Sequence, residues 1–404
     1  MIEVMKRMTD FDCFTLESAA RNPTGSGLLD GIRIAVKDLI AIGGHTSSFG
    51  TARWRETHDP ALADAPVVAK LRAAGGEVVG TTKMDQLAYS LIGNVGEGDP
   101  PINVFDTDSY CGGSSSGSAS AVAADAADIG VGTDTAGSIR VPAAACGLFG
   151  FRPTHGRLET VGVVPLAPSF DVVGFLTHDP AVLRDVMAVV GTGLTARSGP
   201  ARILFPSDVW AMQDQLDSAA ALAATERIRD ELDAEIIHEP LQQFFDQTAG
   251  DLLARLQGRE IWAQHERWVT DNANVLADDV QLRLSGCASL AADSLEVQQA
   301  DHDAHRRYVD ELVTSIPTGT VAIVPVRPQR GPLRASTNAE LFAFRRASFC
   351  LTAPSTLAGL PQLVVPVLYN SRASPIGLVG ARHSDEALIE LATTLSSGNT
   401  EVQL

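Results

Sequence analysis

The sequence predicts an α/β protein, because short apolar runs typical of strands alternate along the chain with segments typical of helices. Residues 32–36 have the pattern of a buried strand, 61–74 that of a helix, and 77–79 that of the next strand. Gly75 and Gly76 follow the helix directly, and glycine often ends a helix because it tolerates a left-handed backbone. With 404 residues and 45% hydrophobic content, the chain can bury a large core.

The remaining elements continue this alternation around two glycine-rich loops. In chain order we expect a helix at 84–91, a loop at 106–118, a helix at 119–127, strands at 128–132, 147–151, 321–326, 362–367 and 376–379, and a closing helix at 385–395. Residues 207–315 differ, since they are rich in Ala, Asp, Glu, Gln and Arg and poor in glycine. We expect a helical subregion there, within a single domain spanning 1–404, because no repeat or linker divides the chain.

Charge and cysteine usage argue against several classes of function. The formal net charge is −18, and such an acidic surface repels phosphate backbones, so nucleic-acid binding is not expected. No apolar run reaches the roughly 18 residues of a membrane helix, and the first 14 residues lack the apolar core of a signal peptide. The five cysteines show no C-x-x-C spacing, which fits reduced thiols. We therefore expect a cytoplasmic protein without membrane association.

One lysine and two serines carry the strongest chemical signal. Lys37 ends the first apolar strand, Ser114 opens a serine cluster in the glycine-rich run 112–118, and Ser138 closes a second tight loop at 132–138. A serine becomes a nucleophile when a base removes its proton, and a lysine held neutral can be that base, whereas an arginine cannot. The three residues together indicate a serine hydrolase with a lysine base.

The setting of Lys37 is unusual among the lysines of this chain. Only four lysines occur, and Lys37 alone lies in a strand-like apolar stretch, whereas Lys70 and Lys83 are expected in helical or polar settings. Lowering a lysine pKa from about 10.4 to about 7 requires about 4.6 kcal/mol, and apolar burial can supply it. Asp38 would oppose that shift, but neighbours on a strand face opposite sides.

The loop that ends at Ser138 has the composition of an oxyanion hole. Successive backbone N–H groups of Thr135, Ala136, Gly137 and Ser138 can point at one developing negative charge. One donor of this kind is typically worth about 3 kcal/mol in the transition state. We therefore expect these four residues to stabilise a tetrahedral intermediate.

Other patterns in the sequence have weaker support. Residues 113–117 match the G-x-S-x-G nucleophile elbow, with Ser115 as nucleophile, but no hydrophobic strand precedes them. Residues 191–196 match a dinucleotide fingerprint in letters, yet they follow a helical pattern where a strand is required. Cys111 is more typical of a packing cysteine than of a nucleophile. The nine histidines show no metal-ligand spacing, so no metal or cofactor is expected.

Two long motifs resemble the amidase signature family. They are CGGSSSGS at 111–118 and GTDTAGSIRVP at 132–142, and shorter matches lie at 31–38, 149–157, 359–361 and 365–366. The resemblance implies a central mixed β-sheet covered by helices on both faces. It also implies a Ser–cis-Ser–Lys triad, in which Ser138 is the nucleophile, Ser114 the bridging serine after a cis bond to Gly113, and Lys37 the base.

The family resemblance further implies an acyl-enzyme reaction. Lys37 draws a proton through Ser114, and Ser138 attacks an amide carbonyl. The family usually has glycine where Ala136 stands, so we expect a slightly narrower oxyanion hole without inactivation. Stretches at 65–68, 84–90 and 169–171 look like the short plant-type indole-3-acetamide hydrolases. Candidate substrate-binding residues are Gly112, Gly113, Met84 and Tyr89.

Three functions are compatible with these motifs. The first is a stand-alone amidohydrolase that releases ammonia from a small primary carboxamide, such as an arylacetamide. The second is a glutaminase subunit of an amidotransferase or other complex, although the acidic chain and the short segment before Lys37 argue against a transfer-RNA amidotransferase. The third is a catalytically silent scaffold, which the presence of all three triad candidates disfavours. The helical middle could support a homodimer or a small partner subunit.

Overall fold

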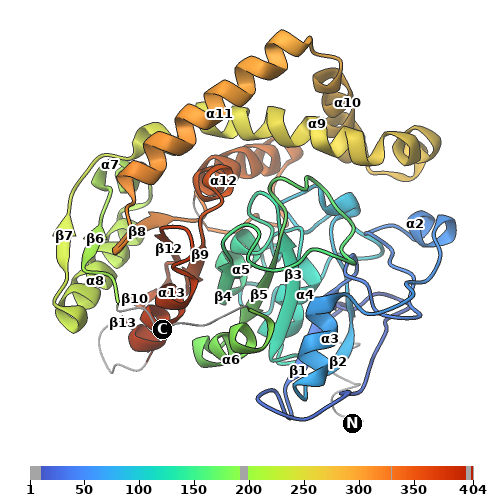
Figure 1. The fold of residues 1–404 in the computed structure, drawn as a ribbon, viewed down its shortest axis with the longest axis horizontal. Helices are drawn as coiled ribbons and strands as arrows, with labels where there is room; N and C mark the ends of the chain where they lie inside the picture. The colour runs from blue at the N-terminus through green and yellow to red at the C-terminus, as the bar shows by residue number, and fades with distance from the viewer. Residues whose placement is uncertain (1–10, 192–198, 329, 397–401, 404) are drawn as a thin grey trace.

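A ten-stranded mixed sheet runs through the computed structural model, which describes residues 11–191, 199–328, 330–396 and 402–403 (Figure 1). The strand order is β2-β1-β3-β5-β4-β9-β12-β8-β6-β7. Strands β2, β1 and β3 are parallel to each other. The pairs in the centre of the sheet, from β3–β5 to β12–β8, are antiparallel. The strands are β1 (Arg33–Lys37), β2 (Glu77–Thr82), β3 (Ile129–Asp134), β4 (Phe149–Arg152), β5 (Val172–Thr177), β6 (Arg202–Leu204), β7 (Glu235–Ile237), β8 (Thr320–Pro325), β9 (Gln362–Val365) and β12 (Ile376–Gly380).

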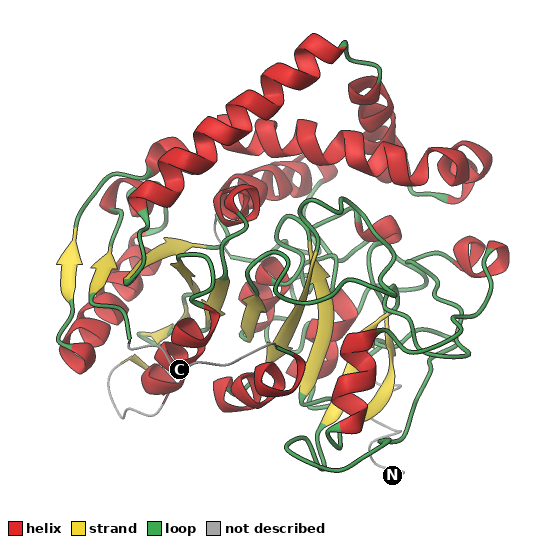
Figure 2. Ribbon diagram, viewed as in Figure 1, coloured by secondary structure: helices red, strands yellow, loops and turns green. Residues whose placement is uncertain are grey.

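Helices cover both faces of this sheet, as the family resemblance implied (Figure 2). On β5, Phe175 belongs to one buried cluster and Leu176 to another, and successive strand residues point to opposite faces. The cluster of Leu176 includes side chains of α4 (Ser116–Ala123) and α5 (Arg140–Cys146). The cluster of Phe175 includes side chains of α3 (Pro66–Ala73), α6 (Pro180–Val190) and α13 (Asp385–Ser396).

Glycines in β3 allow α4 to lie very close to the sheet. A Cβ atom on Gly130 would lie 2.7 Å from the Ser118 carbonyl oxygen, and one on Gly132 would lie 2.6 Å from Ser115 Oγ. Side chains larger than hydrogen would therefore push the helix away. This close approach places the serine cluster, which begins the helix, directly against β3.

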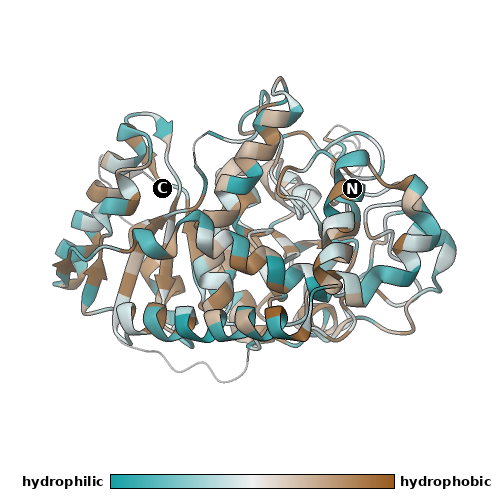
Figure 3. Ribbon diagram, turned by 90° about the horizontal axis from the view of Figure 1, so that it is seen from above, coloured by the Kyte–Doolittle hydropathy of each residue, from teal (hydrophilic) through white to brown (hydrophobic). Residues whose placement is uncertain are grey.

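The predicted helical subregion at 207–315 contains five helices and one strand. They are α7 (Ser207–Trp210), α8 (Gln215–Leu232), β7, α9 (Gln247–Asn272), α10 (Asp278–Ala291) and α11 (Leu295–Ser315). β7 joins the edge of the sheet and α8 packs beside it, whereas α9 and α11 lie over the long helix α12 (Asn338–Ala358) (Figure 1). Figure 3 views the molecule from above, the side on which α9 and α11 lie in Figure 1. The helices on this side are largely hydrophilic, and the strongest hydrophobic colour lies in the strands. The segment thus both extends the sheet and covers it.

The prediction of a helix at 84–91 is wrong. The structure has a single 3-10 turn, η1 (Gln86–Ala88), in which Leu87 and Ala88 have positive φ values of 52° and 55°. The Asp85 carboxylate accepts hydrogen bonds from the N–H groups of Gly93 and Val95, at 3.0 and 3.1 Å, and these bonds bend the segment into a loop. An apolar periodicity cannot show such a contact, because it is made by one polar side chain.

Most other predicted boundaries differ by a few residues. The helix predicted at 119–127 begins earlier, at Ser116, and the one predicted at 61–74 begins at Pro66, where proline suits the first helical turn. The dinucleotide-like run follows α6, whose C-cap is Gly191, and its residues 192–196 lie outside the described part of the chain. In the described ranges, every helix is too short or too polar to cross a membrane.

The remaining short elements lie at the periphery. They are the helix α2 (Ala52–Thr57), the 3-10 turns η2 (Gln242–Phe244) and η3 (Ala273–Val275), and a three-stranded sheet of β10 (Leu368–Tyr369), β11 (Arg372–Ala373) and β13 (Val402–Gln403).

Candidate active site

Three separate elements bring Lys37, Ser114 and Ser138 to the carboxyl ends of parallel strands. Lys37 is the last residue of β1, which lies between β2 and β3. Ser114 comes just before α4, and Ser138 lies in the turn between β3 and α5. The carboxyl edge of a parallel sheet is where α/β proteins commonly place their ligand sites.

Lys37 is fully buried and touches the first serine. Its Nζ lies 2.8 Å from Ser114 Oγ and 2.9 Å from Thr133 Oγ1. Burial lowers the pKa of Lys37 from 10.5 to about 7, although three nearby carboxylates, Asp85, Asp134 and Asp171, raise it. Desolvation therefore outweighs the carboxylates and favours the neutral amine.

Asp38 does not oppose this effect at the lysine nitrogen. Its carboxylate lies 2.7 Å from His45 Nε2 and accepts the Ser48 N–H at 2.8 Å. These partners lie on the loop after β1, so Asp38 is engaged away from Ser114. The alternation of strand side chains predicted this orientation.

The peptide bond between Gly113 and Ser114 is cis, as the resemblance implied. Gly113 packs against Asp85 so closely that a Cβ atom would lie 1.9 Å from Asp85 Oδ2. The Asp85 N–H also donates to the Ser114 carbonyl oxygen at 3.3 Å. Asp85 thus holds the backbone around Ser114 in place, a role that the sequence analysis missed. Burial raises the pKa of this carboxyl to about 6.

Ser138 faces a narrow cavity. Its side chain is almost fully buried, and its hydroxyl forms no hydrogen bond to any described residue, Ser114 included. Catalytic hydrogen bonds are often long in a free enzyme and tighten with substrate present. The cavity volume of 20 Å³ is room for about one water molecule.

The predicted oxyanion hole needs one correction. The Gly137 N–H donates to Asp134 Oδ1 at 2.8 Å, so it is not available to a substrate oxygen. The N–H groups of Thr135, Ala136 and Ser138 have no hydrogen bond to any described residue. Gly137 contributes its conformation instead, since its φ of +122° is a region that favours glycine.

A buried ionic network holds this loop, and the sequence analysis did not find it. Asp134 pairs with Arg140 at 2.8 Å and with Arg152 at 3.1 Å, and all three side chains are fully buried. Burial raises the pKa of Asp134, but the two guanidinium groups hold it well below its usual range. Arg140 also donates to the Thr352 carbonyl oxygen at 2.8 Å, which joins the loop to α12. The only sequence signal was the position of Asp134 and Arg140 inside one motif.

The other predicted binding residues divide into two groups. Tyr89 lines the cavity beside Ser138, as predicted. Met84 is buried in the main core, and Gly112 and Gly113 lie beside Ser114 without lining the cavity. Lining residues that the sequence analysis missed are Ala88, Ser90, Leu91, Leu166, Gln257, Arg345 and Phe349.

The rival motifs have structural explanations. Ser115 is fully buried, and its hydroxyl donates to the Thr133 carbonyl oxygen at 3.3 Å. The Cys111 thiol is buried and donates to the Pro101 carbonyl oxygen at 3.5 Å. No cluster of three potential metal ligands occurs among the described residues. Ser138 therefore differs from Ser115 in facing a cavity.

Two serines and a buried lysine at the edge of a mixed sheet are the arrangement of a serine hydrolase without a catalytic histidine. Residues 15–209 match the Amidase family model. Amidase 1 of Oryza sativa subsp. japonica is 30% identical to this chain, over 91% of this chain and 90% of its own length. The indoleacetamide hydrolase of Pseudomonas syringae pv. syringae is 32% identical, over 68% of this chain and 66% of its own.

Comparison of structures agrees with these sequence matches. A crystal structure of an amidase superposes with a TM-score of 0.81 at 24% identity, covering 97% of this chain and 94% of the other. That likeness supports the fold alone. From the sequence matches, this chain belongs to the amidase family and is a hydrolase acting on amide C–N bonds.

Proposed function

We propose that this protein hydrolyses a small carboxamide through an acyl-enzyme formed on Ser138, with Ser114 and Lys37 relaying protons. The observation that carries the proposal is the 2.8 Å contact between the buried Lys37 nitrogen and Ser114 Oγ. A neutral amine in this position can accept the Ser114 proton. Burial supplies that neutral form, because it lowers the lysine pKa to about 7.

The first half of the reaction forms the acyl-enzyme. Ser114 gives its proton to Lys37 and takes the proton of Ser138, whose oxygen attacks the amide carbonyl carbon. The free N–H groups of Thr135, Ala136 and Ser138 donate to the resulting oxyanion. The C–N bond then breaks while Ser114 returns a proton to the leaving nitrogen, so that ammonia or an amine departs.

The second half releases the acid. A water molecule attacks the acyl carbonyl carbon, and its proton passes to Ser114 and Lys37 along the same route. The intermediate collapses, Ser138 regains its proton, and the carboxylic acid leaves. Every proton carrier and the nucleophile come from this chain, and we therefore propose a reaction without metal or cofactor.

Thr133 holds the base in position. With Lys37 neutral, Nζ accepts the Ser114 hydroxyl proton and donates one of its own hydrogens to Thr133 Oγ1, 2.9 Å away. This second contact fixes the direction of the nitrogen lone pair. The narrow cavity at Ser138 favours a small acyl group near the reacting carbon.

The family similarity supports a stand-alone enzyme. The rice Amidase 1 match covers 91% of this chain and 90% of its own length, and that relative is named an amidase rather than a subunit of a complex. We also propose a cytoplasmic location, which is supported by five cysteines that are all buried free thiols.

The test is ammonia release from a panel of primary amides by the isolated chain. We expect Ser138→Ala to lower kcat at least about 1,000-fold, because it removes the nucleophile. Ser115→Ala is the matched control from the serine cluster, and we expect it to retain activity within about tenfold. Circular dichroism would verify that both variants fold. An active Ser138→Ala enzyme would remove this residue from the mechanism.

A further inference from the structure

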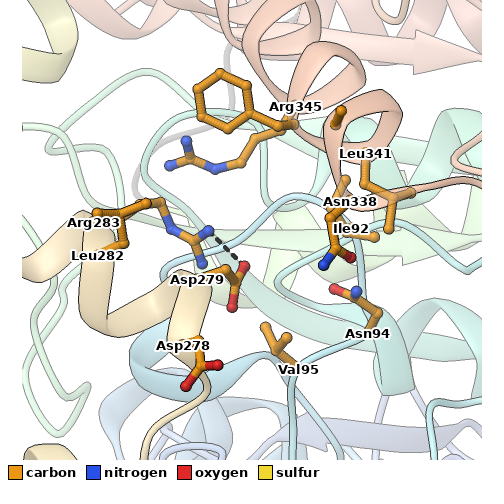
Figure 4. Close-up of a pocket in the computed structure, with 12 residues that line it drawn as sticks. Ile92, Asn94, Val95, Asp278, Asp279, Leu282, Arg283, Asn338, Leu341 and Arg345 are labelled. Atoms are coloured by element: carbon orange, nitrogen blue, oxygen red, sulfur yellow. Dashed lines mark hydrogen bonds and ion pairs between the residues drawn. The ribbon is translucent and has the colours of Figure 1, made fainter.

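A larger pocket lies next to the cavity of Ser138 (Figure 4). Its volume is about 530 Å³, within the usual range for small-molecule sites. It lies between the first turn of α10, the start of α12 and the loop that contains Asn94 and Val95. Arg345 of α12 lines both this pocket and the cavity of Ser138, so a ligand at Arg345 would be within reach of the nucleophile.

Arg345 has no acidic partner among the described residues. Its guanidinium carbon lies 5.5 Å from the centre of the Tyr89 ring and 5.9 Å from that of Phe349. Its Nε is buried and has no hydrogen-bond acceptor in the described part of the chain. Burial lowers the pKa of Arg345 to about 10, so the side chain is still charged at neutral pH. A buried donor without an acceptor is costly unless a ligand supplies one.

A second guanidinium group lies near the first. Arg283 of α10 also lies 5.5 Å from the Tyr89 ring, and its positive charge helps to lower the pKa of Arg345. Figure 4 shows the Arg283 guanidinium directed at Asp279. Arg283 pairs with Asp279 at 2.6 Å, yet its Nε and Nη2 are buried without an acceptor in the described part of the chain. Asp278 also lines the pocket, on the same first turn of α10 as Asp279. Neither Asp278 nor Asp279 forms an ion pair with Arg345.

We propose that Arg345 and Arg283 bind a carboxylate of the substrate, and that the natural substrate is a carboxamide bearing this carboxylate at the end away from the amide. Guanidinium groups match a carboxylate through paired N–H donors, and an anion between the two would relieve their repulsion. This substrate class rests on the proposed amide hydrolysis at Ser138. With the amide at Ser138 and the carboxylate at Arg345, the short linker passes beside Tyr89.

Binding to an inactive protein tests the proposal without turnover. We would titrate Ser138→Ala protein by calorimetry with succinamate, glutaramate and adipamate. Each has a neutral partner in which an isopropyl group replaces the carboxylate: 4-methylpentanamide, 5-methylhexanamide and 6-methylheptanamide. We expect at least one of the three amido acids to bind at least about tenfold more tightly than its neutral partner. If none of them does, the proposal is overturned.

Variants of α12 assign the preference to Arg345. In the Ser138→Ala background, Arg345→Met should reduce the preference to below about threefold by weakening only the amido acid, and Arg345→Lys should restore part of it. The matched control is Arg346→Met, because Arg346 is the next residue, is exposed and bonds to Gln247 at 2.6 Å. Equal weakening of both ligands by Arg345→Met would contradict a role in carboxylate recognition.

Kinetics separate this proposal from the proposed function. Ammonia release from the six amides by the enzyme with Ser138 intact should give a higher kcat/KM for the preferred amido acid than for its neutral partner, mainly through KM. Hydrolysis of the neutral amides at equal efficiency would overturn the substrate class and leave the proposed function intact. A binding preference with no hydrolysis of any amide would contradict the proposed function instead.

Discussion

Two lysines at neighbouring strand ends show what a buried base requires. Lys37 ends β1, and Lys83 directly follows β2, whose last residue Thr82 lies opposite Lys37. Both side chains are buried, and Lys83 has the polar surroundings that the sequence predicted. Lys83 Nζ pairs with Asp12 at 2.6 Å and donates to the Asp99 carbonyl oxygen at 2.9 Å, whereas the hydrogen bonds of Lys37 Nζ go to two hydroxyl groups.

The difference teaches that burial alone does not make a lysine a candidate general base, because its hydrogen-bond partners matter as well. A carboxylate in contact stabilises the ammonium form, and the lysine then acts as a structural cation. Hydroxyl groups can accept from an ammonium and also donate to a neutral amine. The hydroxyl groups around Lys37 therefore allow its nitrogen to gain and lose a proton during a reaction.

Exchanging each lysine for methionine tests this comparison most strongly. Lys37→Met should lower kcat/KM for amide hydrolysis about 1,000-fold, because the relay loses its base. Lys83→Met should keep kcat/KM within about tenfold and lower the free energy of unfolding by about 1 kcal/mol, since it loses one ion pair. Ammonia release and urea denaturation would measure the two effects. Comparable losses of activity in both variants would contradict the distinction.

The pH dependence sharpens the same comparison. Because the folded pKa of Lys37 is lowered from 10.5 to about 7, the neutral base predominates above pH 7. We expect kcat/KM to fall about tenfold per pH unit well below pH 7, and Lys83→Met to keep that profile. In the window from about pH 7 to 10.5 the unfolded chain binds more protons at Lys37, so stability should rise with pH. A Lys37→Met protein that shows the same rise in urea denaturation would contradict this assignment.

Thr133→Val gives the smallest expected effect. Valine keeps the shape and removes the hydroxyl, so Lys37 keeps Ser114 as its one hydrogen-bond partner. We expect kcat/KM to fall about 3- to 10-fold and the midpoint of the pH profile to move to lower pH, because the ammonium form loses an acceptor. Thr82→Val is the matched control, since the Thr82 hydroxyl bonds to Ser118 instead, at 2.7 Å. An unchanged midpoint in Thr133→Val would show that this contact does not influence the base.

The candidate residues were predictable because their motifs are local. Glycine-rich loops around Ser114 and Ser138, and a lysine at the end of an apolar strand, are visible within windows of a few residues. The Asp134 network was not predictable in the same way. One of its arginines, Arg140, reaches groups on α12 that lie more than 200 residues away in the sequence, such as the Thr352 carbonyl oxygen.

The two wrong predictions, the helix at 84–91 and the Gly137 donor, have the same physical cause as the failure to predict the Asp134 network. The segment at 84–91 has an apolar pattern that suits a helix, but the Asp85 carboxylate accepts the N–H groups of Gly93 and Val95 and prevents it. Gly137 lies in a loop whose composition suits an oxyanion hole, but its N–H donates to Asp134 and is not free. In both cases one buried carboxylate selects which backbone groups remain free.

The sequence by itself determined the alternating strands and helices, the two loops and the chemical types that converge on them. Periodicity and loop composition act over short distances along the chain, so they can be recognised without coordinates. Only the tertiary structure decided which of the two buried lysines, Lys37 and Lys83, has no carboxylate in contact, which N–H groups are free, and that Arg283 and Arg345 line one pocket near Ser138. Those outcomes depend on burial and on partners from distant parts of the chain, which set the pKa values and the unsatisfied donors.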